Sequence, residues 1–368
     1  MALLSATFLY PANIPTSFIS LSRNPTLSSL LLLPSSRKQF AISSSASSST
    51  IATDSSRLEI TTSIPVSTPN WAQFASRVSG EWDGFGADFT REGNPIELPE
   101  TVVPEAFREW EVQVFDWQTQ CPTLASVTDE RPLLSYKLIK LLPTVGCEAD
   151  AATRHSVEER IAGEEGSAIS AFAYDPSGCY VAMWSVDGRG GRRAFELEHC
   201  LVDPRNWEVR VRVIQVVGVD DEGVMRLEKI RVFSEQWYGP FRNGEQLGGC
   251  AIRESGFAAT SPVELSEVGG VWQQTNVLVA KFGTSQNEVL QEFSADRPQK
   301  LVRNHVGIVP LPKQLWCFFE ESKNGEVLGE VGWLFDHGKM MTSRCILFKD
   351  GKVKETAIAY ETAVLEDT

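Results

Sequence analysis

The sequence predicts an all-β protein made of two antiparallel up-and-down barrels in tandem. Three observations support this: runs of alternating apolar and polar residues, tight-turn signals between them, and a Gly-x-Trp tripeptide near the start of each half. The tripeptides are Gly80–Trp82 and Gly270–Trp272. No long helical pattern separates the runs, so parallel crossovers are not expected. Closing each meander into a barrel would remove its exposed edges.

The alternation is clearest in the stretch 207–213. Trp and Val occupy the odd positions, while Glu208, Arg210 and Arg212 occupy the even ones. This period of two predicts a strand with one face in the core and the other in water. One helix is expected before the first Gly-x-Trp, because Thr68 can cap it and Pro69 suits its first turn. Its apolar stripe consists of Trp71, Phe74, Ala75 and Val78.

Turn signals separate the predicted strands at short intervals. Asp-Gly and Asn-Gly pairs supply the positive φ angles that tight hairpins need. A series of such hairpins indicates an antiparallel meander. The signals are Asp175–Gly178, Asp187-Gly188, Asp220–Gly223, Asn324-Gly325 and Asp350-Gly351.

The N-terminal region has the composition of a plastid transit peptide. Residues 1–53 are rich in Ser and Thr, contain no acidic residue, and carry only Arg23, Arg37 and Lys38 as charges. This profile predicts import into a chloroplast, with residence in the stroma or at the thylakoid surface. A disordered Ser-rich tail is the alternative. We assign residues 54–67 to a linker, 68–245 to the first barrel and 246–368 to the second.

The charge balance argues against nucleic acid as a partner. The chain carries a formal net charge of −14, and removal of the three basic residues of the leader would bring it to −17 (31 basic minus 48 acidic). Such a surface repels polyanions. No apolar run approaches the length of a membrane span, so no transmembrane segment is expected.

No arrangement of residues names a reaction or a cofactor. The seven cysteines are scattered without C-x-x-C spacing, and the four histidines form no metal-binding motif. Buried reduced thiols explain the cysteines. Glu198, His199 and Cys200 are adjacent, but neighbours on a strand point to opposite faces, so we expect no metal site. Without a nucleophile–base pair, the question of catalysis stays open and leans towards no enzyme.

The two Gly-x-Trp tripeptides and a late arginine resemble the signature of the lipocalins and the wider calycin superfamily. A closer resemblance is to an uncharacterised family of paired lipocalin-like domains from cyanobacteria and plastids. It is carried by Asn70 to Gly84, by Gly332–Leu334 followed by Arg344, and by Tyr360-Glu361. The resemblance implies two lipocalin-like barrels over residues 68–368.

In such barrels an arginine from a late strand packs across the tryptophan of the first strand. The resemblance therefore implies barrel closure by Gly80 and Trp82 in the first half, with Arg231 as the arginine. In the second half it implies closure by Gly270, Trp272 and Arg344. We expect Arg344 to stack on Trp272, and Gly270 to be there because a side chain would crowd the closure. The alternative is that Arg344 pairs with a ligand carboxylate.

Trp184, Trp333 and Arg344 are the candidate ligand-binding residues, since aromatic side chains can line a cavity for a flat apolar molecule. Filled barrels are the competing interpretation. Arg189, Arg192 and Arg193 lie in a Gly-rich loop and form a candidate site for a phosphate, a lipid headgroup or a propionate. A solvated hairpin tip explains the same loop.

We expect a plastid binding protein for a hydrophobic small molecule, such as a tetrapyrrole, a lipid or an isoprenoid. Two other functions are compatible with the sequence. One is a calycin-type lyase or isomerase. The other is a scaffold or assembly factor that contacts a plastid protein.

Overall fold

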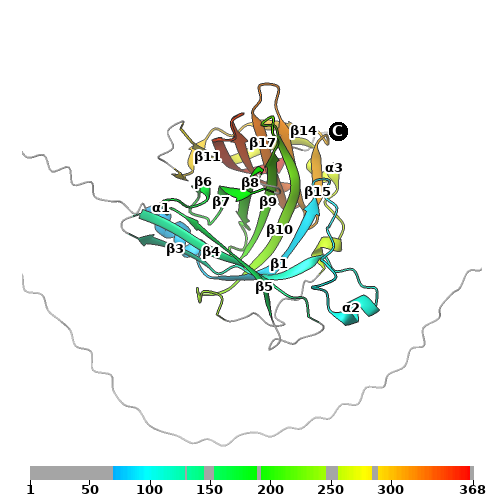
Figure 1. Ribbon diagram of the computed structural model, residues 1–368. Coiled ribbons are helices and arrows are strands. Elements are labelled where there is room, and N and C mark those ends of the chain that lie inside the picture. Colours follow the sequence, from blue (N-terminus) through cyan, green and yellow to red (C-terminus); the bar gives the residue numbers. More distant parts are fainter. Residues whose placement is uncertain are drawn as a thin grey trace, which may run out of the picture. The chain divides into compact units, whose positions relative to one another are not determined.

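Two β-sheets make up most of the chain in the computed structural model, which describes residues 69–128, 131–144, 153–188, 192–245, 256–283 and 289–364 (Figure 1). All of them belong to a unit that runs from Thr62 to Thr368. The transit peptide expected at 1–53, the linker at 54–67 and the cap at Thr68 lie outside the described residues. The same holds for 246–255, where the boundary between the two halves is expected.

The N-terminal half begins with a short helix and continues almost entirely as strands. Its elements are α1 (Pro69–Val78), β1 (Glu81–Thr90), α2 (Glu105–Glu109), β2 (Asp116–Gln120), β3 (Thr123–Thr128), β4 (Arg131–Leu141), β5 (Arg154–Ala162), β6 (Ile169–Tyr174), β7 (Tyr180–Asp187), β8 (Arg193–Val202), β9 (Val209–Val219) and β10 (Met225–Gly239).

The C-terminal half repeats this order of a short helix followed by strands. Its elements are the 3-10 helix η3 (Phe257–Ala259), α3 (Leu265–Val268), β11 (Gly270–Lys281), β12 (Leu290–Glu292), β13 (Ser294–Asp296), β14 (Lys300–Arg303), β15 (Ile308–Leu311), β16 (Leu315–Glu321), β17 (Val327–Asp336), β18 (Lys339–Leu347) and β19 (Val353–Ala363).

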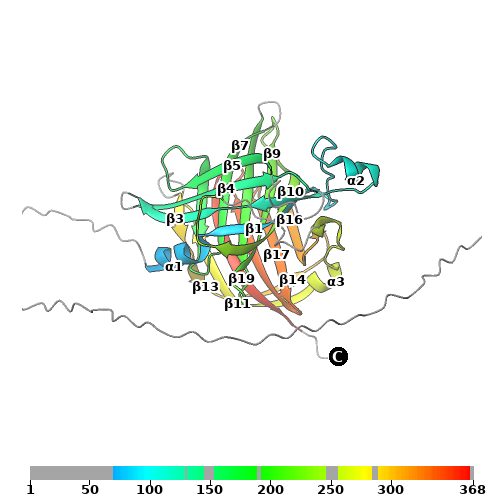
Figure 2. The same ribbon diagram turned by 90° about the horizontal axis from the view of Figure 1, so that it is seen from below.

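The first sheet curls into a half-barrel. Its strand order is β12-β6-β7-β8-β9-β10-β1-β2-β4-β3, with β5 on β4. The hydroxyl of Tyr136 on β4 nevertheless donates a hydrogen bond to Glu198 on β8, although β9, β10, β1 and β2 lie between these strands in the sheet. Only a strongly curved sheet brings such side chains together. Figure 2 shows the curl, with β3 and β4 running across the direction of β17 and β19.

The second sheet is built in the same way. Its order is β13-β11-β19-β18-β17-β16-β15, with β14 on β11. Arg303 on β14 reaches Glu330 on β17 at 3.0 Å, across β11, β19 and β18. One strand leaves this pattern: β12 follows β11 in the chain but pairs in parallel with β6 of the first sheet. The halves therefore share a strand pairing as well as a packed interface.

The main hydrophobic core lies between the two sheets. It takes Leu197 and Val213 from the first sheet and Val331 and Cys345 from the second. Two hydrogen bonds cross it: His199 Nδ1 to Ser343 Oγ at 2.8 Å, and Gln215 Nε2 to the carbonyl of Phe318 at 3.0 Å. Neighbouring residues on these strands face away from this core, as the two-residue period of a strand requires.

The expected turns and the first helix are confirmed. All five turn signals fall between paired antiparallel strands, namely β6–β7, β7–β8, β9–β10, β16–β17 and β18–β19. Trp71, Phe74 and Val78 of α1 are buried, so the apolar stripe faces the core. The five described cysteines are buried and free. Trp110 follows α2 and is 62% exposed.

The expectation that one face of β9 meets water is wrong. Val211 and Val213 pack between the sheets as the alternation predicted, but Arg210 is 1% exposed and Arg212 is 0% exposed. Both arginines point to the concave side of the first sheet, where they bind Glu235. Polar residues at alternate positions look the same in a sequence whether they meet water or charged partners in a curled sheet.

Candidate ligand-binding site

The two Gly-x-Trp tripeptides have the same geometry in both halves. The indole N–H of Trp82 donates to the carbonyl of Val78, at the end of α1, at 2.8 Å. That of Trp272 donates to the carbonyl of Val268, at the end of α3, also at 2.8 Å. Both tryptophans are buried. The repeat seen in the sequence is thus a structural repeat, in which a helix end is fixed to the first strand of each sheet.

The two glycines share a backbone conformation but differ in their surroundings. Gly80 has φ +145° and Gly270 has φ +109°, a region that residues with a Cβ rarely adopt. A Cβ on Gly80 would come within 2.1 Å of Trp237 Nε1, whereas nothing lies within 4 Å of a Cβ on Gly270. The expectation that crowding requires Gly270 is therefore wrong, and its conformation is the reason.

The expected arginine partners of these tryptophans are not the observed ones. The guanidinium carbon of Arg210 lies 4.0 Å from the centroid of the Trp82 ring. Arg231 instead forms ion pairs with Glu196 and Asp88, at 3.3 Å and 3.9 Å. In the sequence, Arg210 stands at a polar position of an alternating strand, and that pattern predicts a solvent-facing side chain.

Arg344 does not reach Trp272. Arg344 pairs with Ala357 across β18 and β19, while Trp272 pairs with Ala363 of β19. Six residues along a strand correspond to about 20 Å. Arg344 instead donates to Glu355 at 3.1 Å. In this half the cation over an indole ring is Arg303, 5.1 Å from the centroid of Trp316.

Trp184 belongs to a buried polar cluster that fills the concave side of the first sheet. Its indole N–H donates to Glu198 at 2.8 Å. Glu198 also accepts hydrogen bonds from Tyr180 at 2.8 Å and from Arg212 at 2.9 Å. Burial alone would raise the pKa of Glu198, but the cations Arg212 and Arg160 and the tyrosine hydroxyls lower it to about 2. A carboxylate with this many donors has a structural role.

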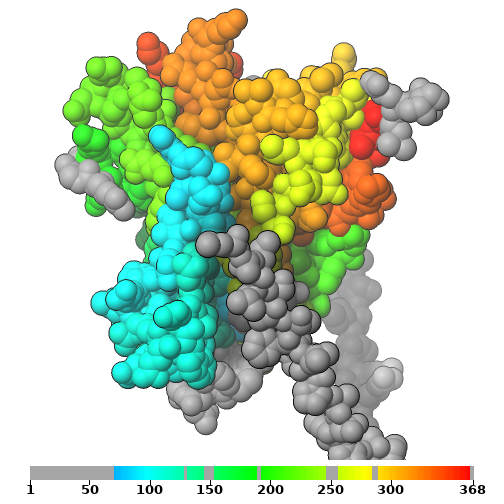
Figure 3. Space-filling view, turned by 90° about the vertical axis from the view of Figure 1, so that its right-hand side faces the viewer, coloured from blue at the N-terminus to red at the C-terminus, as the bar shows by residue number. Residues whose placement is uncertain are grey.

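A cleft beside the inter-sheet core lies on the other side of the first sheet. Its volume is about 570 Å³, within the range of small-molecule sites. Figure 3 shows how the N-terminal half, in cyan and green, meets the C-terminal half, in yellow and orange. The first sheet supplies one wall from β1, β9 and β10, and the second half supplies Phe257, Lys313 and Trp333.

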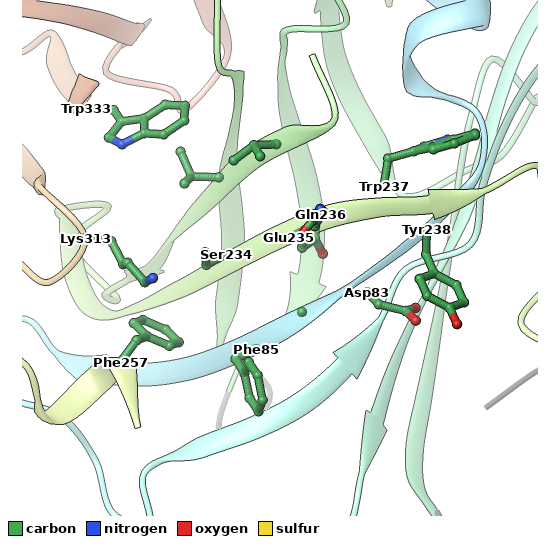
Figure 4. A pocket seen from close by; sticks show the side chains of 13 residues that line it. Asp83, Phe85, Ser234, Glu235, Gln236, Trp237, Tyr238, Phe257, Lys313 and Trp333 are labelled. Carbon is green, nitrogen blue, oxygen red and sulfur yellow. The ribbon is translucent and has the colours of Figure 1, made fainter. Parts of the chain in front are cut away.

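Aromatic residues lie at both ends of this cleft (Figure 4). Phe257 and Trp333 are near Lys313 at one end, and Trp237 and Tyr238 are near Asp83 at the other. Between the ends lie the aromatic ring of Phe85 and the polar side chains of Ser234 and Gln236. The cleft therefore combines apolar surfaces with two acidic residues, Asp83 and Glu235, and one basic residue, Lys313.

Asp83 is a buried acid in the wall of the cleft. Burial raises the pKa of Asp83 to about 6, and the negative charges of Glu81 and Glu235 act in the same direction. The amide of Gln120, 3.3 Å away, opposes this rise. At a pH above 6 the cleft presents a carboxylate, and below it a neutral acid that can donate a hydrogen bond.

Lys313 is presented by a strained turn. It joins β15 to β16, and both central residues have positive φ, +62° at Lys313 and +60° at Gln314. Turns of this kind normally use Asn or Gly. A residue other than Asn or Gly costs free energy at a positive φ, and backbone strain of this kind is concentrated at functional sites. The turn places a lysine at the cleft where a glycine would be favoured by conformation alone.

Asp116 holds the 3-10 helix that carries Phe257. Its Oδ1 accepts the backbone N–H of Ala258 at 3.1 Å. Burial raises the pKa of Asp116, and the backbone N–H groups of Ala258, Phe257 and Gly256 oppose the rise. A residue of β2 thus fixes the segment that covers one end of the cleft.

The structure separates the candidate ligand-binding residues of the sequence. Trp333 lines the cleft, Trp184 lies in the buried cluster, and Arg344 is paired with Glu355. Arg192 and Arg193 lie beside a different cleft, and Arg189 is outside the described residues. Sequence reasoning missed Asp83, Lys313 and Phe257. Only Asp83 carried a signal, since it directly follows the first Gly-x-Trp.

Nine chains of solved structures are similar to this chain, and two of them are described here. One is a protein of unknown function from the DUF3598 family of Nostoc punctiforme, with 12% identity and a TM-score of 0.47, covering 81% of this chain and 100% of that one. The other is a double mutant of the transferrin-binding protein B antigen from Haemophilus parasuis, with 8% identity and a TM-score of 0.15, covering 78% and 77%. No family model and no curated protein matches the chain.

Proposed function

We propose that the protein binds a hydrophobic small molecule, such as a tetrapyrrole, a lipid or an isoprenoid, in the cleft between the two sheets. The observation that carries this proposal is the cleft of about 570 Å³ with aromatic residues at both ends and with Asp83 and Lys313 as polar anchors. Small-molecule sites are typically concave and mostly apolar, with a few convergent polar groups. The filled concave side of the first sheet makes that side a poorer place for a ligand.

Plastid import and a two-barrel origin are supported by separate features of the chain. The acid-free leader at 1–53 supports import into plastids. The repeated helix–Gly-x-Trp unit supports a pair of lipocalin-like barrels as the origin of the two curled sheets. None of the helices in the described part of the chain has the length and apolar character needed to cross a membrane. A reporter fused to residues 1–60 should enter plastids. Its retention in the cytosol would contradict the proposed plastid localisation.

Native mass spectrometry of the mature protein, expressed in plant tissue from the full-length sequence and purified from plastids, tests the binding function. We expect a complex whose mass exceeds that of the protein alone. On denaturation the complex should release one small molecule, and the measured mass should fall to that of the protein. The control is the Trp333→Ser variant after its fold has been checked by circular dichroism. Repeated recovery of wild-type protein without any bound molecule would contradict binding and favour a scaffold that contacts another protein.

A further inference from the structure

A second cleft opens at the other end of the inter-sheet core. Its volume is about 840 Å³. It is lined by the starts of β6, β8 and β19 and the ends of β7 and β11, whereas the first cleft lies at the end of β10 and the start of β9. Because β8 and β9 are antiparallel, these positions are at opposite ends of the paired strands. The two clefts are therefore separate sites.

The wall of this second cleft is apolar and comes from both sheets. Met183 and Phe195 belong to β7 and β8 of the first sheet. Phe282 follows β11 of the second sheet, and Val353 begins β19. Met183, Phe195 and Val353 are members of the buried core, and Phe282 packs against it. An apolar chain entering the cleft would thus continue the main hydrophobic core of the protein.

Cations gather at the edge of the same cleft. Arg192 and Arg193 lie at the start of β8, and Lys352 lies in the turn between β18 and β19. Two acidic residues, Asp187 and Asp350, also line the cleft, so the formal net charge of its lining is +1 (3 − 2). The whole chain has a net charge of −14, so this edge differs in sign from the average surface.

One contact fixes the two basic segments to each other. Arg193 Nη2 donates to the backbone carbonyl of Asp350 at 2.9 Å. Gly351 permits this approach, because a Cβ there would come within 2.7 Å of the same nitrogen. The cations from the two sheets are therefore held on one side of the cleft, next to its apolar wall.

We propose that this second cleft binds a single-chain amphiphile with an anionic head, such as a fatty acid. The acyl chain lies against Met183, Phe195 and Phe282, and the head group meets Arg192 and Lys352. Guanidinium groups bind carboxylate and phosphate strongly through paired hydrogen bonds. The anion is either a free carboxylate or the phosphate of a lysophospholipid, which share this chemistry. This site is independent of the function proposed for the first cleft.

Displacement of a fluorescent fatty acid, 11-(dansylamino)undecanoic acid, from the full chain tests the proposal. Decanoate, dodecanoate and lysophosphatidic acid with a twelve-carbon chain are the competitors, and methyl dodecanoate is the uncharged control. Burial of a methylene group should improve affinity about fourfold, so dodecanoate should displace the probe at roughly fifteen-fold lower concentration than decanoate. Tighter binding by the lysophospholipid would identify phosphate as the preferred head; tighter binding by dodecanoate would identify carboxylate.

The variants Arg192→Gln and Lys352→Gln should each weaken dodecanoate binding several-fold and leave methyl dodecanoate unaffected. Arg226→Gln is the matched control, because Arg226 is an exposed arginine beside Asp220 that does not line this cleft. Equal binding of the acid and its methyl ester, equal loss in all three variants, or no displacement would overturn the proposal. The first-cleft variant Lys313→Gly should bind dodecanoate normally, so failure of one proposal is distinguishable from failure of the other.

Discussion

Arg210 lies over the indole ring of Trp82, with its guanidinium carbon 4.0 Å from the ring centroid, and it also binds Glu235. The residue that covers the first-strand tryptophan therefore comes from β9 and is buried. Its charge is satisfied by a carboxylate on β10, so the contact joins three strands of the curled sheet.

The Arg210→Ala variant should lose ~3–5 kcal/mol of unfolding free energy, because it removes one partner from a buried ion pair. Arg231→Ala is the control, since Arg231 is the arginine that the sequence favoured and it is partly exposed. Its loss should be smaller, because part of the Arg231 side chain stays in contact with water. Urea denaturation of the purified variants measures both. A larger loss for Arg231→Ala would contradict the assignment of Arg210.

The hydrogen bonds from Trp82 and Trp272 to the preceding helices predict similar behaviour in the two halves. Trp82→Phe and Trp272→Phe each leave a buried carbonyl without its donor, at Val78 and Val268 respectively. Each should cost about 1–3 kcal/mol from that lost hydrogen bond, in addition to the smaller ring. Trp110→Phe, at an exposed position, should change stability little. Thermal denaturation measures the losses. A loss of stability in only one of the two variants Trp82→Phe and Trp272→Phe would contradict the structural repeat.

The two glycines should respond differently to alanine. Gly80→Ala meets both an unfavourable φ and a close contact with Trp237, whereas Gly270→Ala meets only the unfavourable φ. We expect about 1–2 kcal/mol of destabilisation for Gly270→Ala and a clearly larger loss for Gly80→Ala. Chemical denaturation gives both values. Equal losses would mean that the contact at Gly80 relaxes freely.

Asp83 should make stability depend on pH. Its pKa rises from 3.8 in the unfolded chain to about 6 in the folded protein, so the folded state holds the proton more tightly. Its favourable contribution is complete below pH 3.8 and is lost as pH rises through about 6. Asp83→Asn should therefore be more stable than wild type at pH 8, and the difference should shrink towards pH 4.

Asp88 on the same strand provides the opposite control for that experiment. Burial would raise the pKa of Asp88, but Lys140, Lys229 and Arg231 lower it below its ordinary value. Asp88→Asn should therefore destabilise the protein at pH 8. Melting temperatures of both variants measured from pH 4 to pH 8 give the comparison. If Asp83→Asn and Asp88→Asn shift stability in the same direction at pH 8, the assignment for Asp83 is wrong.

Local features of the fold were predictable from the sequence, and long-range partners were not. Hairpin turns such as Asp350-Gly351 and the stripe of α1 depend on neighbouring residues, so a pattern reveals them. The burial of Arg212 depends on the curl of the whole sheet, which brings Tyr136 of the distant strand β4 to it. Likewise, a two-residue alternation identifies β9 as a strand. It does not show whether the polar side chains of β9 face water or a buried carboxylate.

The candidate site was less predictable for the same reason. Trp333 was identified because it is aromatic and lies in a strand. Lys313 and Phe257 have no local pattern, and they line the cleft only because β15–β16 and η3 pack against β1 and β10 of the first sheet. Arg344 matched a motif, yet the register of β18 and β19 places it away from Trp272.

The turn at Lys313 offers the most direct test of binding in the first cleft. Lys313→Gly removes the amine and relieves a positive φ, so the variant should be about 0.5–1 kcal/mol more stable. Gln314→Gly relieves the same strain one residue later, and Gln314 does not line the cleft. Stability alone therefore cannot separate these variants, but ligand affinity can.

The decisive measurement is a titration of the wild type and both variants with protoporphyrin IX, a flat apolar molecule with carboxylates, followed by quenching of tryptophan fluorescence. We predict saturable binding by wild type, unchanged affinity in Gln314→Gly, and affinity reduced about tenfold in Lys313→Gly through loss of a charged hydrogen bond. Equal affinity in all three proteins, or no saturable quenching in the wild type, would contradict the assignment of this cleft as the ligand-binding site.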